Sequence, residues 1–81
     1  MRPEDRVRIA HMIEAAQNAI EFAAGRDRVD LDSDRMLLFA LVRAIEIIGE
    51  AASKLSPTAR SEESQIPWEL MVSMRNRLIH A

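Results

Sequence analysis

The sequence has no cysteine and no tyrosine, and its 81 residues include only two glycines and three prolines. Without cysteine, disulfides and thiolate metal sites are excluded as sources of stability. Nothing points to an oxidising compartment, so we expect a cytoplasmic protein. Few glycines and prolines, together with no low-complexity tract, are typical of an ordered helical domain.

Long uncharged hydrophobic runs are also missing at the start of the chain. The opening residues, MRPEDRVRIAHM, carry charges on both sides of the apolar residues, which a signal-peptide core or a membrane span would not allow. The chain is therefore expected to be soluble and unexported. Its formal net charge is -2, so the protein as a whole does not attract a polyanion, and any contact with nucleic acid must be local.

The size of the chain limits its stability. A chain of 81 residues forms at most one domain and buries only roughly 60% of its unfolded surface. We therefore treat residues 1–81 as a single helical domain whose stability is marginal by itself. A second protein chain is the expected source of additional stability.

Apolar residues at steps of three and four predict a first long helix. Pro3 suits the first position of a helix, and Gly25 suits a left-handed turn after its end. Asp32 or Ser33 is then expected to cap the next helix. The predicted apolar stripe of the first helix consists of Ile9, Ile13, Ala16, Ile20 and Ala23.

A second helix, over residues 34–55, is apolar nearly all the way round. Such a helix is buried on more than one side, and a short chain has too few helices to cover it, so we expect a second subunit against it. Gly49 predicts the close approach of another helix. The polar residues form one narrow stripe, in which Glu50 is placed to pair with Lys54. The stripe consists of Arg43, Glu46, Glu50 and Lys54.

Ser56 and Pro57 predict a short helical turn, and Pro67 predicts the start of a last helix. Trp68 is interpreted as a packing anchor of that helix. No capping residue follows Ala81, so we expect the chain to be the front portion of a longer domain, or to be capped by another group. Four methionines are interpreted as core filling: Met12, Met36, Met71 and Met74.

The last segment, MVSMRNRLIHA, contains the candidate site residues Arg75, Asn76 and His80. Asn76 and His80 share a helix face, whereas Arg75 lies roughly 140° around the axis from His80. A single helix therefore cannot bring the arginine and the histidine together. Two such helices meeting across a two-fold axis can place the arginine of one chain near the histidine of the other.

These residue types suit RNA cleavage without a metal. Histidine titrates near pH 6.5 or so, and can take a proton from a ribose 2′-hydroxyl or give one to a leaving oxygen. The planar guanidinium of arginine matches phosphate oxygens, and asparagine can orient either group. No cysteine and no second histidine near His80 argue against a metal, so no cofactor is expected.

Purely structural interpretations of these residues are also open. Arginine and histidine near a helix C-terminus also complement the helix dipole. His11 is interpreted as a surface or boundary residue. Glu46 and Glu50 lack the Glu-x-x-His spacing of di-iron bundles, and we interpret them as part of the polar stripe. A catalytically inactive helical module that binds a nucleotide or a nucleotidyltransferase is the alternative function, and a purely structural dimerisation bundle is a third reading.

Two segments, AIEIIGEAASKLS and IPWELMVSMRNRLIHA, resemble the HepT-like toxins of the HEPN superfamily, over the second helix and all that follows it. The resemblance implies an all-α antiparallel bundle that dimerises, and a metal-independent endoribonuclease with a composite site. It implies Arg75 and His80 as catalytic residues and Asn76 as polar support, with no role assigned to Glu50.

The same resemblance implies the toxin of a type II toxin-antitoxin system, with RNA as substrate and a nucleotidyltransferase antitoxin as partner. The family motif continues with a tyrosine two residues after the histidine and then with a further helix. Both lie beyond Ala81, so the resemblance implies a domain that lacks its C-terminal helix here.

Overall fold

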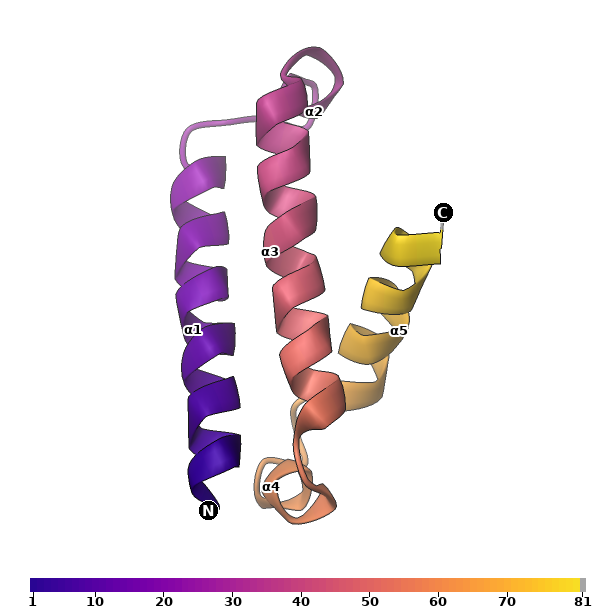
Figure 1. Ribbon diagram of the computed structural model, residues 1–81. Helices are drawn as coiled ribbons and strands as arrows, with labels where there is room; N and C mark the ends of the chain where they lie inside the picture. The colour runs from indigo at the N-terminus through magenta and orange to yellow at the C-terminus, as the bar shows by residue number, and fades with distance from the viewer. Residues whose placement is uncertain (81) are drawn as a thin grey trace.

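The computed structural model describes residues 1–80, which form an all-α antiparallel bundle (Figure 1). α1 and α3 lie side by side and run in opposite directions, and α5 runs back along the lower part of α3 before tilting away from it. This arrangement confirms the predicted fold class. The helices are α1 (Pro3–Ala23), α2 (Asp30–Ser33), α3 (Arg35–Lys54), α4 (Pro57–Glu62) and α5 (Trp68–His80).

The start of α1 and the turn after it confirm the predictions from proline and glycine. Pro3 is the first residue of α1, where its missing N–H group would have no partner within the helix. Gly25 follows the end of the helix with a φ of 70°, a conformation that favours glycine. The prediction for the end of the last helix concerns Ala81 and lies outside the described residues.

The connection between α1 and α3 differs from the prediction. It contains a single helical turn, α2, and the cap of α3 is Asp34 rather than Asp32 or Ser33. The Asp34 Oδ1 atom accepts a hydrogen bond of 3.1 Å from the backbone N–H of Leu37. Every second or third residue of this segment is an aspartate that can cap a helix, so the sequence did not single out the correct one.

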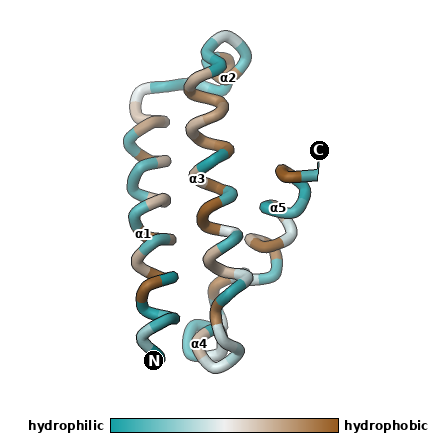
Figure 2. The backbone as a smooth tube through the Cα atoms, viewed as in Figure 1, coloured by the Kyte–Doolittle hydropathy of each residue, from teal (hydrophilic) through white to brown (hydrophobic). Residues whose placement is uncertain are grey.

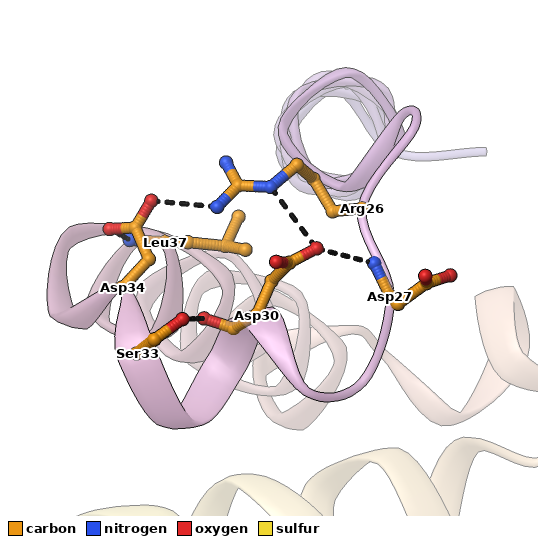
Figure 3. Close-up of polar contacts among 6 residues, drawn as sticks. All are labelled: Arg26, Asp27, Asp30, Ser33, Asp34 and Leu37. Carbon is orange, nitrogen blue, oxygen red and sulfur yellow. Dashed lines mark hydrogen bonds and ion pairs between the residues drawn. The ribbon is translucent and has the colours of Figure 1, made fainter.

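Arg26 joins the carboxylates of this connection (Figure 3). Its Nη2 donates to Asp34 Oδ2 at 2.9 Å, and its Nε lies 3.4 Å from Asp30 Oδ2. Asp30 Oδ2 also accepts from the backbone N–H of Asp27 at 2.7 Å. One guanidinium thus links α2 to the residue that caps α3.

The core of the bundle is built mainly from small side chains. Five of the nine buried hydrophobic residues in the described part of the chain are alanines. Alanines at an interface let two helix axes come close, but each buries little apolar area. The nine are Met12, Ala15, Leu37, Ala44, Ala51, Ala52, Leu55, Ala59 and Trp68.

The predicted apolar stripe of α1 is only partly covered. Ile13 is 53% exposed and Ile20 is 71% exposed, whereas Met12 and Ala15 are buried. α1 packs mainly on α3, and one neighbouring helix cannot cover the whole apolar side of α1. The periodicity therefore indicated the helix correctly, but not the residues that face its neighbour.

The four methionines predicted to fill the core also divide into covered and exposed residues. Met12 is buried and Met71 is half-buried, as core filling requires. Met36 is 83% exposed and Met74 is 52% exposed, so the interpretation as core filling was wrong for these two. Both lie on parts of α3 and α5 that no other described helix covers.

α3 is the central helix of the bundle. α1 packs on one part of its surface and α5 on another, which confirms burial on more than one side. Figure 2 shows hydrophobic residues along much of α3, whereas hydrophilic residues interrupt them along α1. Within residues 1–80, none of the helices has the length and apolar character needed to cross a bilayer.

The short helix α4 confirms the predicted turn at Ser56 and Pro57, and it is tied to α1. Ser56 Oγ accepts a hydrogen bond from the backbone N–H of Ala59 at 3.2 Å and donates one to Asp5 Oδ2 at 2.7 Å. The Ser56 backbone N–H donates to Asp5 Oδ1 at 3.0 Å. Asp5 is only 3% exposed, and these bonds satisfy its carboxylate.

Trp68 begins α5 as a buried anchor, as predicted. Its indole Nε1 donates to the carbonyl oxygens of Arg60 and Glu63, each at 3.1 Å. These two carbonyls lie at the end of α4, so Trp68 fixes the direction in which the chain turns into α5. The angle of α5 against α3 follows from this turn.

Candidate functional site

The three candidate site residues lie on α5, in the half that leads to His80. Arg75 is half-buried, whereas Asn76 and His80 are exposed. α5 packs against α3, so α3 determines where these residues stand relative to the rest of the bundle. The position of Arg75 depends on this contact most directly.

Gly49 on α3 faces Arg75 on α5. A Cβ atom placed on Gly49 would overlap the Cβ of Arg75 and would lie 2.9 Å from the carbonyl oxygen of Met71. Only glycine fits at this point, which confirms the prediction that Gly49 permits a close helix approach. The sequence did not indicate that the residue it meets is Arg75.

Arg75 and Asn76 are brought together within one chain. Arg75 Nη1 donates a hydrogen bond of 3.0 Å to Asn76 Oδ1, so the amide orients the guanidinium. His80 makes no hydrogen bond to either side chain within the described residues. Its place roughly 140° around α5 from Arg75 accounts for the separation. A single chain therefore contains the guanidinium of Arg75 and the imidazole of His80 but does not bring them into contact.

The end of α5 is positively charged and open to an anion. The ion pairs in the described part of the chain join Arg26 to Asp30 and Asp34, and Lys54 to Glu50. Among residues 1–80, neither Arg75 nor Arg77 has a carboxylate partner. Arg77 also lies in the last turn of the helix, where the dipole favours positive charge.

The polar stripe of α3 is present, with the predicted ion pair. Lys54 Nζ lies 3.3 Å from Glu50 Oε1, and both side chains remain partly exposed. Glu50 directly follows Gly49, but it lines a groove between α1 and α3. Within residues 1–80, no three histidine, aspartate or glutamate side chains form a group that could hold a metal ion.

The α1/α3 groove has a volume of about 530 Å³. His11 is exposed on its wall, as expected for a surface residue. Arg8 also lines the groove, and its place there was not evident from the sequence. The spacing of Glu4, Arg8 and His11, at steps of four and three, is the signal that puts them on one face of α1.

Sequence comparisons relate the chain to known proteins. The family model described as "Ribonuclease HepT-like" matches residues 12–81. The chain is 38% identical over 69 residues to "Putative RNase MJ1380" of Methanocaldococcus jannaschii, an alignment that covers 85% of this chain and 63% of the relative. It is 36% identical over 72 residues to "Putative RNase TTE0752" of Caldanaerobacter subterraneus subsp. tengcongensis, covering 89% of this chain and 64% of the relative.

A third relative, "Probable ribonuclease HepT" of Thermococcus cleftensis, is 42% identical over 52 residues, covering 64% of this chain and 47% of the relative. The chain thus spans between about half and two thirds of the length of these three relatives. No solved structure matches it. Because the family model extends from the middle of α1 through both α3 and α5, the chain belongs to the HepT-like family.

Proposed function

We propose that the chain is a ribonuclease in which Arg75 and His80 act on the RNA backbone. The observation that carries the proposal is the contact of Gly49 with Arg75 inside the region matched by the ribonuclease family model. It holds the arginine of the candidate motif at a fixed point of the bundle. The names of the relatives, which describe ribonucleases, support the same function.

His80 is the proton-transfer residue of the proposed reaction. Its neutral imidazole takes the proton of a ribose 2′-hydroxyl, and the oxygen attacks the adjacent phosphorus. The bond from phosphorus to the 5′-oxygen breaks, and that oxygen receives a proton from an imidazolium. The products are a 2′,3′-cyclic phosphate and a free 5′-hydroxyl, and no metal takes part.

Arg75 stabilises the charge that builds up on the phosphate during this reaction. Its guanidinium presents two parallel N–H donors to phosphate oxygens and stays charged at any physiological pH. Asn76 holds one edge of that guanidinium through the bond of 3.0 Å, which leaves the other edge free for the substrate. Asn76 is therefore a positioning residue.

The proposed active form is a homodimer with a composite site. Arg75 and His80 stand roughly 140° apart on one helix, so the arginine of one chain meets the histidine of the other only if two α5 helices come together. Leu70 is 70% exposed and Met74 is 52% exposed, and the two lie one turn apart on α5. This apolar surface supports the packing of a second copy there.

We also propose that the protein is the toxin of a type II toxin-antitoxin system in the cytoplasm, neutralised by a nucleotidyltransferase. Membership of the HepT-like family supports this assignment. Co-expression with a nucleotidyltransferase encoded beside it tests the assignment, through copurification of the two proteins and loss of RNA cleavage. A neighbouring gene product that neither binds the chain nor alters cleavage would contradict it.

An RNA-cleavage assay in the presence of EDTA tests the ribonuclease proposal. His80→Ala and Arg75→Ala are each expected to lower the rate by about 100-fold or more. Arg28→Ala is the matched control, because it removes the same charge from an exposed residue of the connection before α2, outside α5. Equal rates for all four proteins would overturn the proposal, and loss of cleavage with EDTA would overturn metal independence.

One observation favours the alternative, a catalytically inactive module that binds a nucleotide or a nucleotidyltransferase. Arg75 and His80 do not touch in a single chain, so the positive end of α5 could serve attachment alone. This alternative predicts RNA or nucleotide binding that weakens with salt and persists in His80→Ala, without cleavage by the parent chain.

A further inference from the structure

The α1/α3 groove is positively charged, although the chain as a whole carries a net charge of -2. Arg8, Arg43 and Lys54 line it, against the two carboxylates of Glu4 and Glu50. Glu50 is already paired with Lys54. The groove is therefore a local cationic site on an acidic protein, which is the condition for binding an anion there.

The two arginines stand on opposite walls of the groove. Arg8 comes from α1 and Arg43 from α3, and neither has a carboxylate partner among the ion pairs of residues 1–80. Guanidinium groups are weakly hydrated and match phosphate oxygens in shape. An extended phosphate backbone lying in the groove can therefore contact an arginine on each side.

An exposed aromatic ring lies on α3 beyond the residues that line the groove. Phe39 precedes Arg43 by one helical turn and is 61% exposed. The guanidinium carbon of Arg35 lies 5.9 Å from the centre of its ring. Arg35 covers one side of this ring, and a base of a single strand can stack on the exposed remainder while the nearby arginines bind phosphates.

The groove lies close to the proposed catalytic residues. Glu50, on the groove, follows Gly49, which touches Arg75. The groove and the contact with Arg75 thus lie on neighbouring sides of α3, a helix that is roughly 10 Å across. A single strand a few nucleotides long spans that distance.

We propose that the α1/α3 groove and Phe39 form a binding path for the single-stranded RNA that the site on α5 cleaves. Arg8 and Arg43 hold phosphates, and Phe39 stacks a base. The inference rests on the proposed function and adds the route of the substrate. It favours RNA over an acidic peptide, because the arginines and the exposed ring together match a chain of phosphates and bases.

The test measures binding of a short fluorescein-labelled single-stranded RNA by fluorescence anisotropy. The protein carries His80→Ala, so that cleavage does not interfere. Arg8→Gln and Arg43→Gln should each raise the Kd and lower the slope of log K against log salt by about 0.7. Phe39→Leu should raise the Kd about five-fold or more, and Glu4→Gln should lower it.

Arg6→Gln is the matched control for Arg8→Gln. Arg6 lies on the same helix as Arg8 but roughly 160° around its axis from it. The substitution Arg6→Gln therefore removes one charge without changing the groove. Its Kd should rise, and its salt slope should fall, only as much as the loss of one charge from the whole protein requires. Both changes should be well below those of Arg8→Gln. Circular dichroism of each variant shows whether the fold is retained.

Three results would overturn the inference. The first is an unchanged Kd in folded Arg8→Gln and Arg43→Gln, and the second is an equal loss in Arg6→Gln. The third is displacement of the RNA by polyglutamate with no effect of Phe39→Leu, which would make the groove a general anion site. If the parent chain cleaves RNA and one of these three results is found, the groove inference fails and the ribonuclease proposal stands. If the groove binds RNA as expected but the parent chain does not cleave it, only the ribonuclease proposal is contradicted.

Discussion

Gly49 of α3 and Arg75 of α5 stand at a contact so close that the glycine has no room for even one methyl group. The glycine therefore sets the distance between the two helices at the candidate catalytic arginine. A residue that binds a transition state must be held within a fraction of an ångström or so of its working position. The helix contact supplies that constraint from outside the site.

Gly49→Ala is expected to destabilise the fold and to lower RNA cleavage. Alanine gains about 1 kcal/mol of helix propensity, but overpacking typically costs about 1–3 kcal/mol. The Cβ of Arg75 and the backbone of Met71 cannot yield as a flexible side-chain tip can. Urea denaturation followed by circular dichroism measures the first effect, and the cleavage rate below the transition measures the second. A variant more stable than the parent would show that α3 and α5 are not held this close.

Arg75→Lys tests whether charge alone suffices at this position. Lysine keeps the positive charge but lacks the planar fork that bonds Asn76 on one edge and, in the proposed site, phosphate on the other. We expect cleavage to fall by about 10-fold or more, while thermal stability changes little. Asn76→Ala should produce part of the same loss. Full activity of Arg75→Lys would mean that the guanidinium geometry has no role.

Stability should fall in acid through Asp5. Bonds from the backbone N–H and then the hydroxyl of Ser56 lower the pKa of Asp5 below its ordinary value of 3.8. The unfolded chain therefore binds a proton more readily than the folded one. The stabilisation is complete above the ordinary pKa and is lost as the pH falls through the lower folded value.

Asp5→Asn should flatten the dependence of unfolding free energy on pH in this range. Ser56→Ala should flatten it only in part, because the backbone N–H still bonds the carboxylate. Urea titrations at a series of acidic pH values measure the slopes. If the parent and Asp5→Asn have the same slope, the Asp5 and Ser56 contact does not persist in solution.

Trp68→Phe should destabilise the chain by about 1–3 kcal/mol, since two carbonyl oxygens lose their donor while most of the apolar ring remains. The carbonyls are those of Arg60 and Glu63, which share the indole N–H. Phe22→Leu, at an exposed aromatic residue, is the control and should change stability little. Thermal melts compare the two, and equal effects would argue against the anchoring role of Trp68.

The ion pair of Arg26 with Asp34 should contribute a salt-sensitive share of stability. This contact, more than any other, lowers the pKa of Asp34, whose other oxygen caps α3. Asp34→Asn keeps an oxygen for the Leu37 N–H, so its lower melting temperature should approach that of the parent in high salt. Asp34→Ala also loses the cap and should remain less stable at every salt concentration. Identical melts for the two variants would contradict this separation.

The sequence predicted the long helices well, because each begins at or directly after a proline or an aspartate and carries an apolar period of three and four. It failed where several residues offered the same signal, as in the aspartate-rich connection where Asp34 is the cap. It also failed where burial depends on which neighbour is present. Ile20 and Met36 read as buried, yet no described helix covers them.

The candidate site was predictable in its residues and in part of its geometry. The spacing of Arg75 and His80 already places them on different sides of one helix, as found. The role of Gly49 as a close-contact residue was also evident. Its pairing with Arg75 was not, because the register between α3 and α5 depends on the turn fixed by Trp68, 19 residues along the chain from Gly49.

The alanine-rich core has a consequence for the divergence of related sequences. Where two helices are separated by methyl groups alone, a larger side chain forces the backbones apart, and no compensating loss of volume is available in the opposite wall. Tolerated substitutions are therefore limited to little besides glycine or serine at Ala15, Ala44 and Ala52. Residues on the outer faces of α1 and α3 are free to change. Homologues of this protein should keep a narrow alanine seam long after their surfaces have ceased to look alike.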